Sequence, residues 1–219
     1  MPATMPQRQI EPPAALDWFA SPAGQGLLLA EAAAMERVLQ RCPALPWAWF
    51  GVAGAEPPTV TGRGILLSRR HRDWSGSIRC RLPLPLPSES FGAVLLQHVL
   101  DDAAEPDALL GECARVLAPG GTLWIAALNP WTPYRARWTG SGLHATDPGR
   151  WQAALRRAGL SGNSIAMQWL GPHWRIGPGT AGIGLVDRFR AGIALTVGKR
   201  VRAVIPPARL HLRSAIMGG

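Results

Sequence analysis

Two polar residues follow long apolar runs, at the kind of position where open α/β sheets hold catalytic side chains. His98 follows Gln97 at the end of the run that starts at Phe91, and Asn129 follows the run 122–128. An imidazole can act as a general base near neutral pH, and an asparagine amide can orient a polar group of a substrate. A strand-end histidine bonded to a carbonyl and an asparagine in a turn are the structural alternatives.

Two charged clusters also carry groups that can do chemistry. Asp101-Asp102 is a pair of adjacent carboxylates, and the run 69–72 (Arg-Arg-His-Arg) can bind phosphate. The first cluster lacks an evident partner acid or histidine, so the pattern favours solvated residues at the start of a helix. For the second cluster, a solvated turn is the alternative to an anion site.

Apolar runs and breakers predict the elements that position these residues. Helical spacing predicts helices over 16–42, 106–117, 147–159 and 185–190. Short apolar runs predict strands over 44–52, 64–68, 77–82, 91–99, 122–128, 164–170 and 192–202. Trp47, Trp49, Trp124 and Trp169 lie within these strands, so core packing is predicted for them.

Alternation of short buried strands with helices predicts an α/β fold with a mostly parallel sheet and helices on both faces. Ligands of such sheets bind beyond the carboxyl ends of the strands. The candidate positions are therefore those that follow the predicted strands, namely Gly51–Gly54, Ser68-Arg69, Cys80–Leu82, Gln97-His98 and Asn129-Pro130.

Bulk composition limits the class of protein. The chain has 219 residues, of which 47% are hydrophobic, enough for one domain with a full core. We expect this domain over 14–205, between a loose tail over 1–13 and a basic tail over 206–219. No apolar run is long enough to span a bilayer, and the first residues lack the apolar centre of a secretory signal. With three widely spaced cysteines, the sequence predicts a cytoplasmic protein without a metal site.

The formal net charge of +9 is unevenly distributed. Residues 150–219 contain 11 basic side chains and one acidic side chain, Asp187, whereas residues 1–149 contain 12 basic and 13 acidic side chains. A basic segment of this kind can face nucleic acid, an anionic membrane surface or an acidic partner. The alternative is a solvated, arginine-rich face, and no recognised nucleic-acid module accompanies the charge.

The stretch Leu84–Pro130 carries a family resemblance. LPLPSESFGAVLLQHVL resembles the turn and fourth strand of class I S-adenosylmethionine-dependent methyltransferases (methyltransferase type 11-like), and LLGECARVLAPGGTLWIAALNP resembles their next helix and fifth strand. The resemblance implies a Rossmann-like, seven-stranded sheet with an antiparallel last strand. It also implies S-adenosyl-L-methionine across the carboxyl ends of strands one to four, and an acceptor of unknown identity.

The cofactor side of the chain departs from the family pattern. Transferred position by position, the family's cofactor-binding residues fall on Gly51, Ala53, Gly54, Ser68, Arg69, Arg81, Leu82 and Gln97. An acid is usual before the first glycine loop and at the ends of strands two and three. This chain has Trp49 or Phe50, Ser68 and Cys80 or Arg81 at those places, and Gly92 replaces the aspartate of a Phe-Asp pair.

Three functions are compatible with this sequence. The first is an S-adenosylmethionine-dependent methyltransferase, with His98 and Asn129 as its catalytic candidates. The second is a catalytically inactive relative that keeps the fold as a scaffold or partner-binding surface, since the usual ligand-binding acids are missing. The third is a basic nucleic-acid-associated protein, since residues 150–219 carry a net charge of +10 (11 basic minus one acidic).

Overall fold

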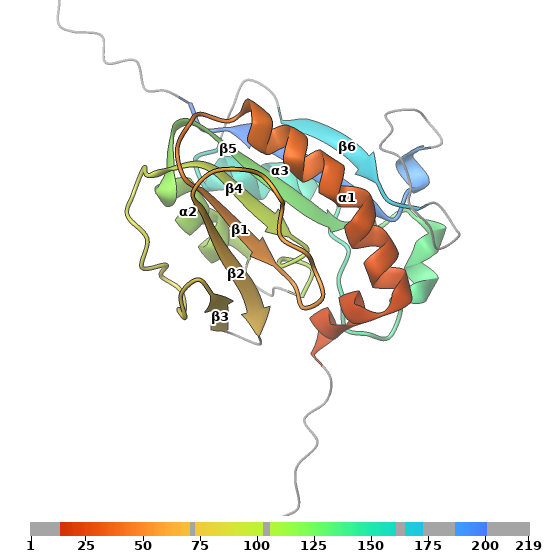
Figure 1. Ribbon diagram of the computed structural model, residues 1–219. Helices are drawn as coiled ribbons and strands as arrows, with labels where there is room; N and C mark the ends of the chain where they lie inside the picture. The colour runs from red at the N-terminus through yellow and green to blue at the C-terminus, as the bar shows by residue number, and fades with distance from the viewer. Residues whose placement is uncertain (1–13, 71–72, 103–105, 161–164, 173–186, 201–219) are drawn as a thin grey trace, which may run out of the picture.

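The computed structural model describes residues 14–70, 73–102, 106–160, 165–172 and 187–200 (Figure 1). The predicted tails over 1–13 and 206–219 lie outside these ranges. No helix in the described ranges is both long enough and apolar enough to cross a bilayer.

A seven-stranded sheet in the order β3-β2-β1-β4-β5-β7-β6 forms the centre of the protein (Figure 1). Its strands are β1 (Trp47–Gly51), β2 (Gly64–Arg70), β3 (Asp73–Gly76), β4 (Phe91–Gln97), β5 (Leu117–Leu128), β6 (Ala166–Leu170) and β7 (Gly192–Gly198). Pairings β2-β1, β1-β4 and β4-β5 are parallel, whereas β3-β2, β5-β7 and β7-β6 are antiparallel. All strands except β3 and β7 therefore run in one direction, which confirms the mostly parallel sheet and its antiparallel last strand.

Helices cover both faces of this sheet, as predicted. The described helices are α1 (Pro22–Arg41), α2 (Pro106–Val116) and α3 (Pro148–Arg157), with 3-10 turns η1 (Ala15–Ala20), η2 (Pro133–Arg137) and η3 (Asp187–Phe189). In Figure 1, α1 crosses one face, and α2 and α3 lie behind the sheet on the other. Capping signals place the helix starts, because the side chains of Ser21 and Asp147 accept from the backbone N–H groups of Gly24 and Gly149.

Alternating side chains of the strands divide the core into two layers. On the α1 face, Trp47, Trp49, Trp124 and Leu95 pack with Met35. On the other face, residues such as Phe50, Leu96 and Ile125 pack with Leu110 and Trp151 of the opposite helices. Trp47, Trp49, Trp124 and Trp169 are at most 9% exposed, which confirms their predicted place in the core.

The predicted third strand over 77–82 is wrong. The chain forms β3 earlier, at Asp73–Gly76, and pairs it antiparallel with β2. Cys80 contributes only an isolated bridge to Trp74. Two residues separate β2 from β3, which is too few for the crossover that a parallel pair needs, so the chain must return antiparallel.

Candidate functional site

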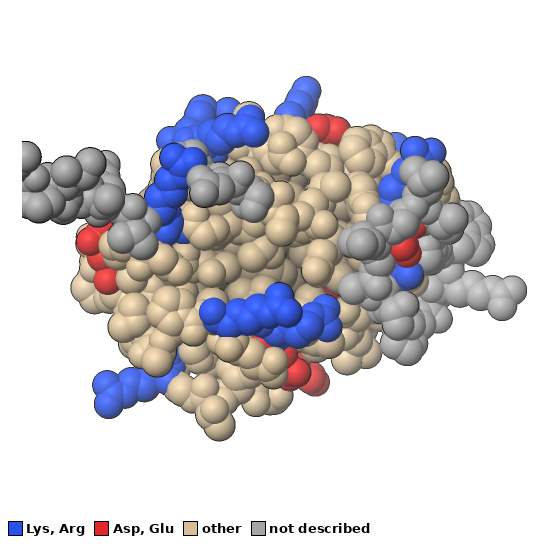
Figure 2. Space-filling view, turned by 90° about the horizontal axis from the view of Figure 1, so that it is seen from above, with Lys and Arg blue, Asp and Glu red and all other residues tan. Residues whose placement is uncertain are grey.

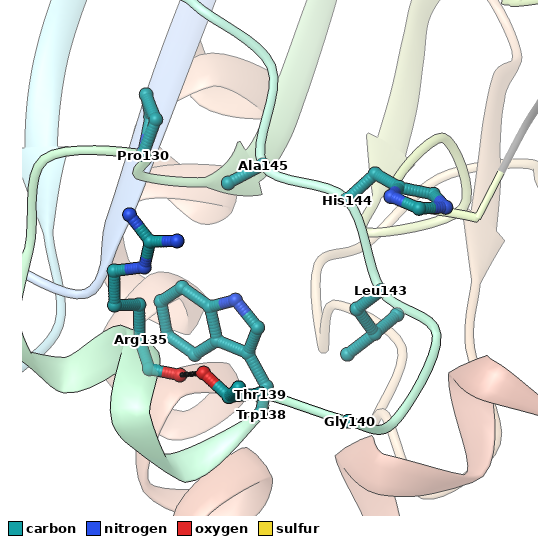
Figure 3. Close-up of a pocket in the computed structure, with 8 residues that line it drawn as sticks. All are labelled: Pro130, Arg135, Trp138, Thr139, Gly140, Leu143, His144 and Ala145. Carbon is teal, nitrogen blue, oxygen red and sulfur yellow. Dashed lines mark hydrogen bonds between the residues drawn. The ribbon is translucent and has the colours of Figure 1, made fainter.

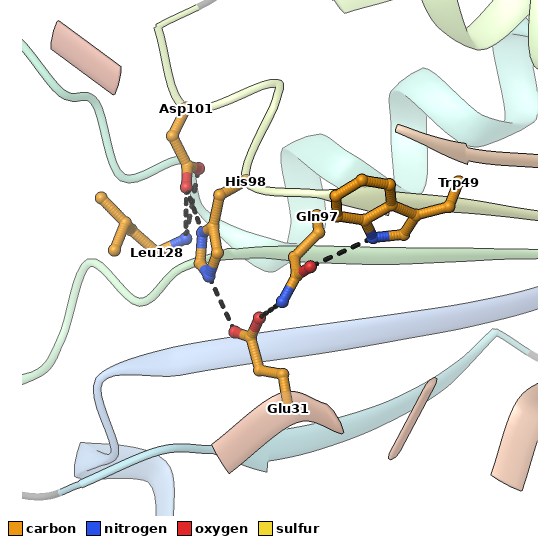
Figure 4. A network of polar contacts seen from close by, with 6 residues as sticks. All are labelled: Glu31, Trp49, Gln97, His98, Asp101 and Leu128. Atoms are coloured by element: carbon orange, nitrogen blue, oxygen red, sulfur yellow. Dashed lines mark hydrogen bonds and ion pairs between the residues drawn. The ribbon is translucent and has the colours of Figure 1, made fainter. Parts of the chain in front are cut away.

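A buried polar cluster lies at the carboxyl ends of β1 and β4. This cluster, the His98 cluster, consists of Glu31, Trp49, Gln97, His98 and Asp101 (Figure 4). His98 lies between two carboxylates, with Nε2 at 2.7 Å from Glu31 Oε1 and Nδ1 at 2.6 Å from Asp101 Oδ2. All three side chains are fully buried. Both ring nitrogens are engaged, so His98 has no nitrogen left for a substrate in this arrangement.

The rest of the His98 cluster continues across the sheet. Gln97 Nε2 donates to Glu31 Oε2 at 2.9 Å, and Trp49 Nε1 donates to Gln97 Oε1 at 3.1 Å. Asp101 accepts from the backbone N–H of Leu128 at 3.2 Å. Polar groups from α1, β1, β4 and β5 therefore satisfy one another, as is usual for buried polar groups.

Buried carboxylates change the protonation of His98. Burial, the largest single influence, lowers its pKa, but the charges and hydrogen bonds of Glu31 and Asp101 together outweigh burial and raise the pKa to about 10. The imidazole is therefore a cation at neutral pH. A cationic imidazole donates through both nitrogens and cannot accept a proton, so this state is unsuited to a general base.

Phe19 closes the cluster from the amino-terminal side. Its ring stacks on the His98 imidazole, with centroids 4.4 Å apart. Gln25 holds this arrangement, because its Nε2 donates to the carbonyls of Phe19 and Gly54, each at 2.9 Å. His98 also has a positive φ of 57°, an uncommon conformation for a residue other than glycine, which two ring hydrogen bonds hold in place.

Side chains of the protein pack against the predicted glycine loop after β1, where a ligand would otherwise approach the backbone. The ring of Trp49 packs over Gly51, so that a Cβ atom at Gly51 would lie 2.1 Å from it. Ala53 is exposed, Gly54 has a φ of 83°, and the Gly54 carbonyl is taken by Gln25. Ser68 pairs in register with Gly51, which brings these two predicted positions together as expected for neighbouring parallel strands.

Arg69, on β2, reaches past the end of β1 to residues that follow β4. Its guanidinium donates to the carbonyl of Val99 and forms an ion pair with Asp102 at 2.9 Å. Burial raises the pKa of Asp102, while the charge of Arg69 acts in the opposite direction. The prediction of two solvated aspartates at 101–102 is wrong, because Asp101 is fully buried and Asp102 is mostly covered.

Arg81 and Leu82 lie apart from the other candidates. They follow the edge strand β3, and Arg81 pairs with Asp73 while its side chain stays 75% exposed. Leu82 is 40% exposed. The prediction places Arg81 and Leu82 at the end of a third strand. That strand forms earlier, at Asp73–Gly76, so the two residues do not join Gly51, Ser68 and Gln97 at the sheet edge.

Asn129 has structural contacts at the end of β5. Its Nδ2 donates to the carbonyls of Arg188 and Arg190 at 2.7 and 2.6 Å, and its Oδ1 accepts from the N–H of Trp131 at 3.0 Å. The side chain is fully buried. It joins the loop after β5 to the segment before β7, and both N–H groups of its amide are used in doing so.

Several positive charges of the carboxyl-terminal third are paired with acids in the described part of the chain. In Figure 2, blue side chains form separate groups around a largely uncharged surface. Arg157, Arg190 and Lys199 pair with Asp107, Asp187 and Glu89. Arg175, Arg202, Arg209 and Arg213 lie outside the described ranges, so an anionic partner for residues 150–219 stays a prediction.

The sequence is similar to a family model and to several known proteins. A family model described as a methyltransferase domain matches residues 72–125. The ubiquinone biosynthesis O-methyltransferase of Caulobacter vibrioides is 33% identical over 92 residues, which cover 36% of this chain and 34% of that protein. An uncharacterized protein of Mycobacterium tuberculosis is 32% identical over 149 residues, covering 64% of this chain and 50% of that protein. The chain thus spans half or less of the length of these two relatives.

Solved structures agree on the fold. An S-adenosylmethionine-dependent methyltransferase from Thermotoga maritima superposes with a TM-score of 0.54 at 17% identity, over 84% of this chain and 94% of that one. A second, from Archaeoglobus fulgidus, gives a TM-score of 0.51 at 11% identity, over 77% and 92%. The fold is that of the class I S-adenosylmethionine-dependent methyltransferases, and the predicted resemblance to that superfamily is confirmed. It implies S-adenosyl-L-methionine as cofactor.

The residues at the carboxyl edge do not fit this cofactor in the described conformation. The ends of β1 and β2 carry Gly51 and Ser68 without a carboxylate to accept from ribose or to hold an ammonium group. Phe19 covers His98, and Arg69 spans to the Val99 carbonyl. The acids nearby already have partners, since Glu31 and Asp101 are bonded to His98 and Asp102 pairs with Arg69. No step of a reaction can be derived through the cofactor from this arrangement.

Phe19 and Glu31 are not among the predicted positions, and Asp101 is predicted as a candidate carboxylate but without its partner His98. Glu31 had a detectable signal, since it lies four residues after Leu27 and four before Met35, on the buried stripe of its helix. Asp101 lies three residues after His98, a spacing that suits a local pair. Phe19 had no comparable signal, because its contact depends on the turn between η1 and α1.

Proposed function

We propose that this chain is a class I methyltransferase-fold protein that acts without methyl transfer, as a scaffold or partner-binding protein. The observation that carries the proposal is the position of His98, fully buried between Glu31 and Asp101 and covered by Phe19. A cationic imidazole paired with both local acids occupies the edge where a cofactor with a sulfonium and an ammonium group has to be held.

Energetic reasoning supports the closed state. Opening the edge separates Phe19 from His98 and breaks the bonds of Gln25 to Phe19 and Gly54. Each lost hydrogen bond costs about 1 kcal/mol, and an unpaired buried charge costs more. A ligand that binds only the open state has to offset this energy. Its apparent affinity is therefore its intrinsic affinity multiplied by the fraction of molecules that are open.

Calorimetric titration with S-adenosylmethionine and S-adenosylhomocysteine tests the proposal. We expect no binding heat with either ligand at millimolar concentration. Tight binding of S-adenosylmethionine, with transfer of its methyl group to any acceptor, would exclude the proposal.

A matched variant distinguishes two explanations for a lack of cofactor binding, namely the closed edge and the loss of an acidic residue. Ser68→Asp restores a carboxylate at the end of β2, where the family usually has one. If only the acid were missing, this variant would gain affinity for S-adenosylmethionine. We expect it to stay without binding, because Phe19 and the His98 cluster still close the edge. A gain of binding in Ser68→Asp would contradict the closed-edge explanation.

Methyl transfer is the second candidate, favoured by the methyltransferase-domain match over residues 72–125. It requires η1 and the start of α1 to move away from His98. Binding of S-adenosylmethionine that increases hydrogen exchange at residues 15–31 would support this candidate over the scaffold. Unchanged exchange at these residues, together with no binding heat, would support the scaffold.

A further inference from the structure

A cavity of about 330 Å³ lies between η2 and the segment 143–145, and none of its lining residues belongs to the His98 cluster, although the His144 N–H donates to the Asp101 carbonyl at 2.7 Å. We propose that it binds a small organic carboxylate through Arg135 and Trp138. Figure 3 shows the guanidinium of Arg135 and the indole nitrogen of Trp138 pointing toward the same space beneath Pro130 and Ala145. The volume lies in the range of small-molecule sites, which begins at about 300 Å³.

Arg135 supplies the charge. Its side chain forms no ion pair or hydrogen bond with another residue in the described ranges, and it lines the cavity. Asp102 and Asp147 have other partners, since Asp102 pairs with Arg69 at 2.9 Å and Asp147 accepts from the N–H of Gly149 at 2.7 Å. A guanidinium offers two parallel N–H donors, which match the two oxygens of a carboxylate.

Trp138 supplies a second hydrogen-bond donor, its indole N–H, and an apolar ring that lines the cavity. It is 5% exposed, and within the part of the chain that has assigned positions its indole N–H makes no hydrogen bond. Its ring packs against Trp18 and Tyr134, with centroids 5.8 and 6.1 Å away. Leu143 adds an apolar surface to the same cavity. An indole N–H can only donate, so the complementary ligand group is an acceptor beside an apolar body.

The backbone around Arg135 is fixed before any ligand arrives. The Arg135 carbonyl accepts from the N–H groups of Trp138 and Thr139 and from Thr139 Oγ1, each at 3.0 Å. At the start of η2, Thr132 Oγ1 accepts from the N–H of Tyr134 and donates to the carbonyl of Phe189. These bonds fix the backbone from which Arg135 and Trp138 project, so a ligand has to order only the Arg135 side chain.

Titration with sodium benzoate at constant ionic strength, followed by the indole N–H signals in ¹H–¹⁵N spectra, tests the site. The chain has 10 tryptophans, and the spectrum of Trp138→Phe assigns the signal of Trp138. We expect a saturable shift of this signal. Arg135→Gln should weaken benzoate by about tenfold or more, as expected for loss of a charge-assisted pair.

Arg156→Gln is the matched control, because it removes one exposed arginine at the end of α3, away from the cavity. It should bind benzoate like the unmodified chain. Equal affinity in Arg135→Gln and the unmodified chain would overturn the proposal, as would shifts that leave the Trp138 signal in place. Saturable binding of inorganic phosphate without binding of benzoate would overturn the assignment to an organic carboxylate. Circular dichroism checks that each variant folds.

Discussion

His98 Nε2 lies 2.7 Å from Glu31 Oε1, and this contact joins the end of β4 to the middle of α1 across 67 positions of the chain. Both side chains are fully buried. Buried charges are tolerated only when paired, so neither residue can be changed alone without leaving the other charge or polar group uncompensated. The pair therefore couples the packing of α1 to the closed carboxyl edge.

Replacing Glu31 by glutamine should destabilise the protein strongly. The change removes one of the two carboxylates that hold the His98 imidazolium, and such a loss in a buried pair costs about 3–5 kcal/mol. Urea denaturation of the variant and the unmodified chain measures the difference. Glu36→Gln, on the same helix, is the control, because among the residues with assigned positions Glu36 makes a single, exposed hydrogen bond, with Thr59. It should change the free energy of unfolding by about 0.5 kcal/mol or less.

Stability should fall as the pH rises from neutral toward 10. His98 has a folded-state pKa of about 10 against 6.5 for the free side chain, so the folded state holds a proton that the unfolded state releases. This contribution is complete below pH 6.5 and is lost as the pH rises through about 10. The slope is on the order of 1 kcal/mol per pH unit within that window.

Denaturation of His98→Gln over the same pH range isolates the effect. The groups that face His98 are Glu31, Asp101 and Phe19, while burial also raises the pKa of Cys113 on α2. Only the difference between the two chains reports on His98. We expect the variant to lack the fall between pH 6.5 and 10, and a parallel fall in both chains would contradict the charge assigned to His98.

Gly51→Ala should destabilise the first strand. A Cβ atom at this position would lie 2.1 Å from the ring of Trp49, which is 2% exposed and bonded to Gln97. Overpacking of this kind costs about 1–3 kcal/mol. Gly111→Ala is the matched control, because Gly111 has no atom within 4 Å of its added Cβ and lies on the exposed side of α2. Thermal denaturation should show the control unchanged or more stable, by up to about 1 kcal/mol.

The sequence predicted the fold better than the site. Continuous apolar runs such as Phe91–Gln97 predict buried parallel strands, and Pro106 and Asp147 mark helix starts, because these are local properties of the chain. The third strand was misplaced because the 77–82 run resembles a strand by composition, while the short connection between β2 and β3 decides the pairing.

The site depends on contacts that local patterns do not encode. Gln97 and His98 were found because they end a strand, but their partner Glu31 lies 66 and 67 positions away. The sequence alone shows that the ends of β1 and β2 lack the usual acidic residues. The residues that fill the edge in their place are Phe19, set by the packing of η1, and Arg69, which reaches from β2 past the end of β1 to Val99 beyond β4.

Asn129→Asp tests whether this residue is structural. The Nδ2 group of Asn129 donates to the Arg188 and Arg190 carbonyls, and a carboxylate would place an oxygen against both acceptors. Because the side chain is fully buried, we expect a loss of about 3–5 kcal/mol in urea denaturation and faster hydrogen exchange at residues 188–191. Gln168→Glu, an exposed position on β6 with the same change of charge, should stay within about 0.5 kcal/mol of the unmodified chain. If Asn129→Asp were equally mild, the loop after β5 would not depend on these bonds, and a role for Asn129 toward a bound substrate would again be the better explanation.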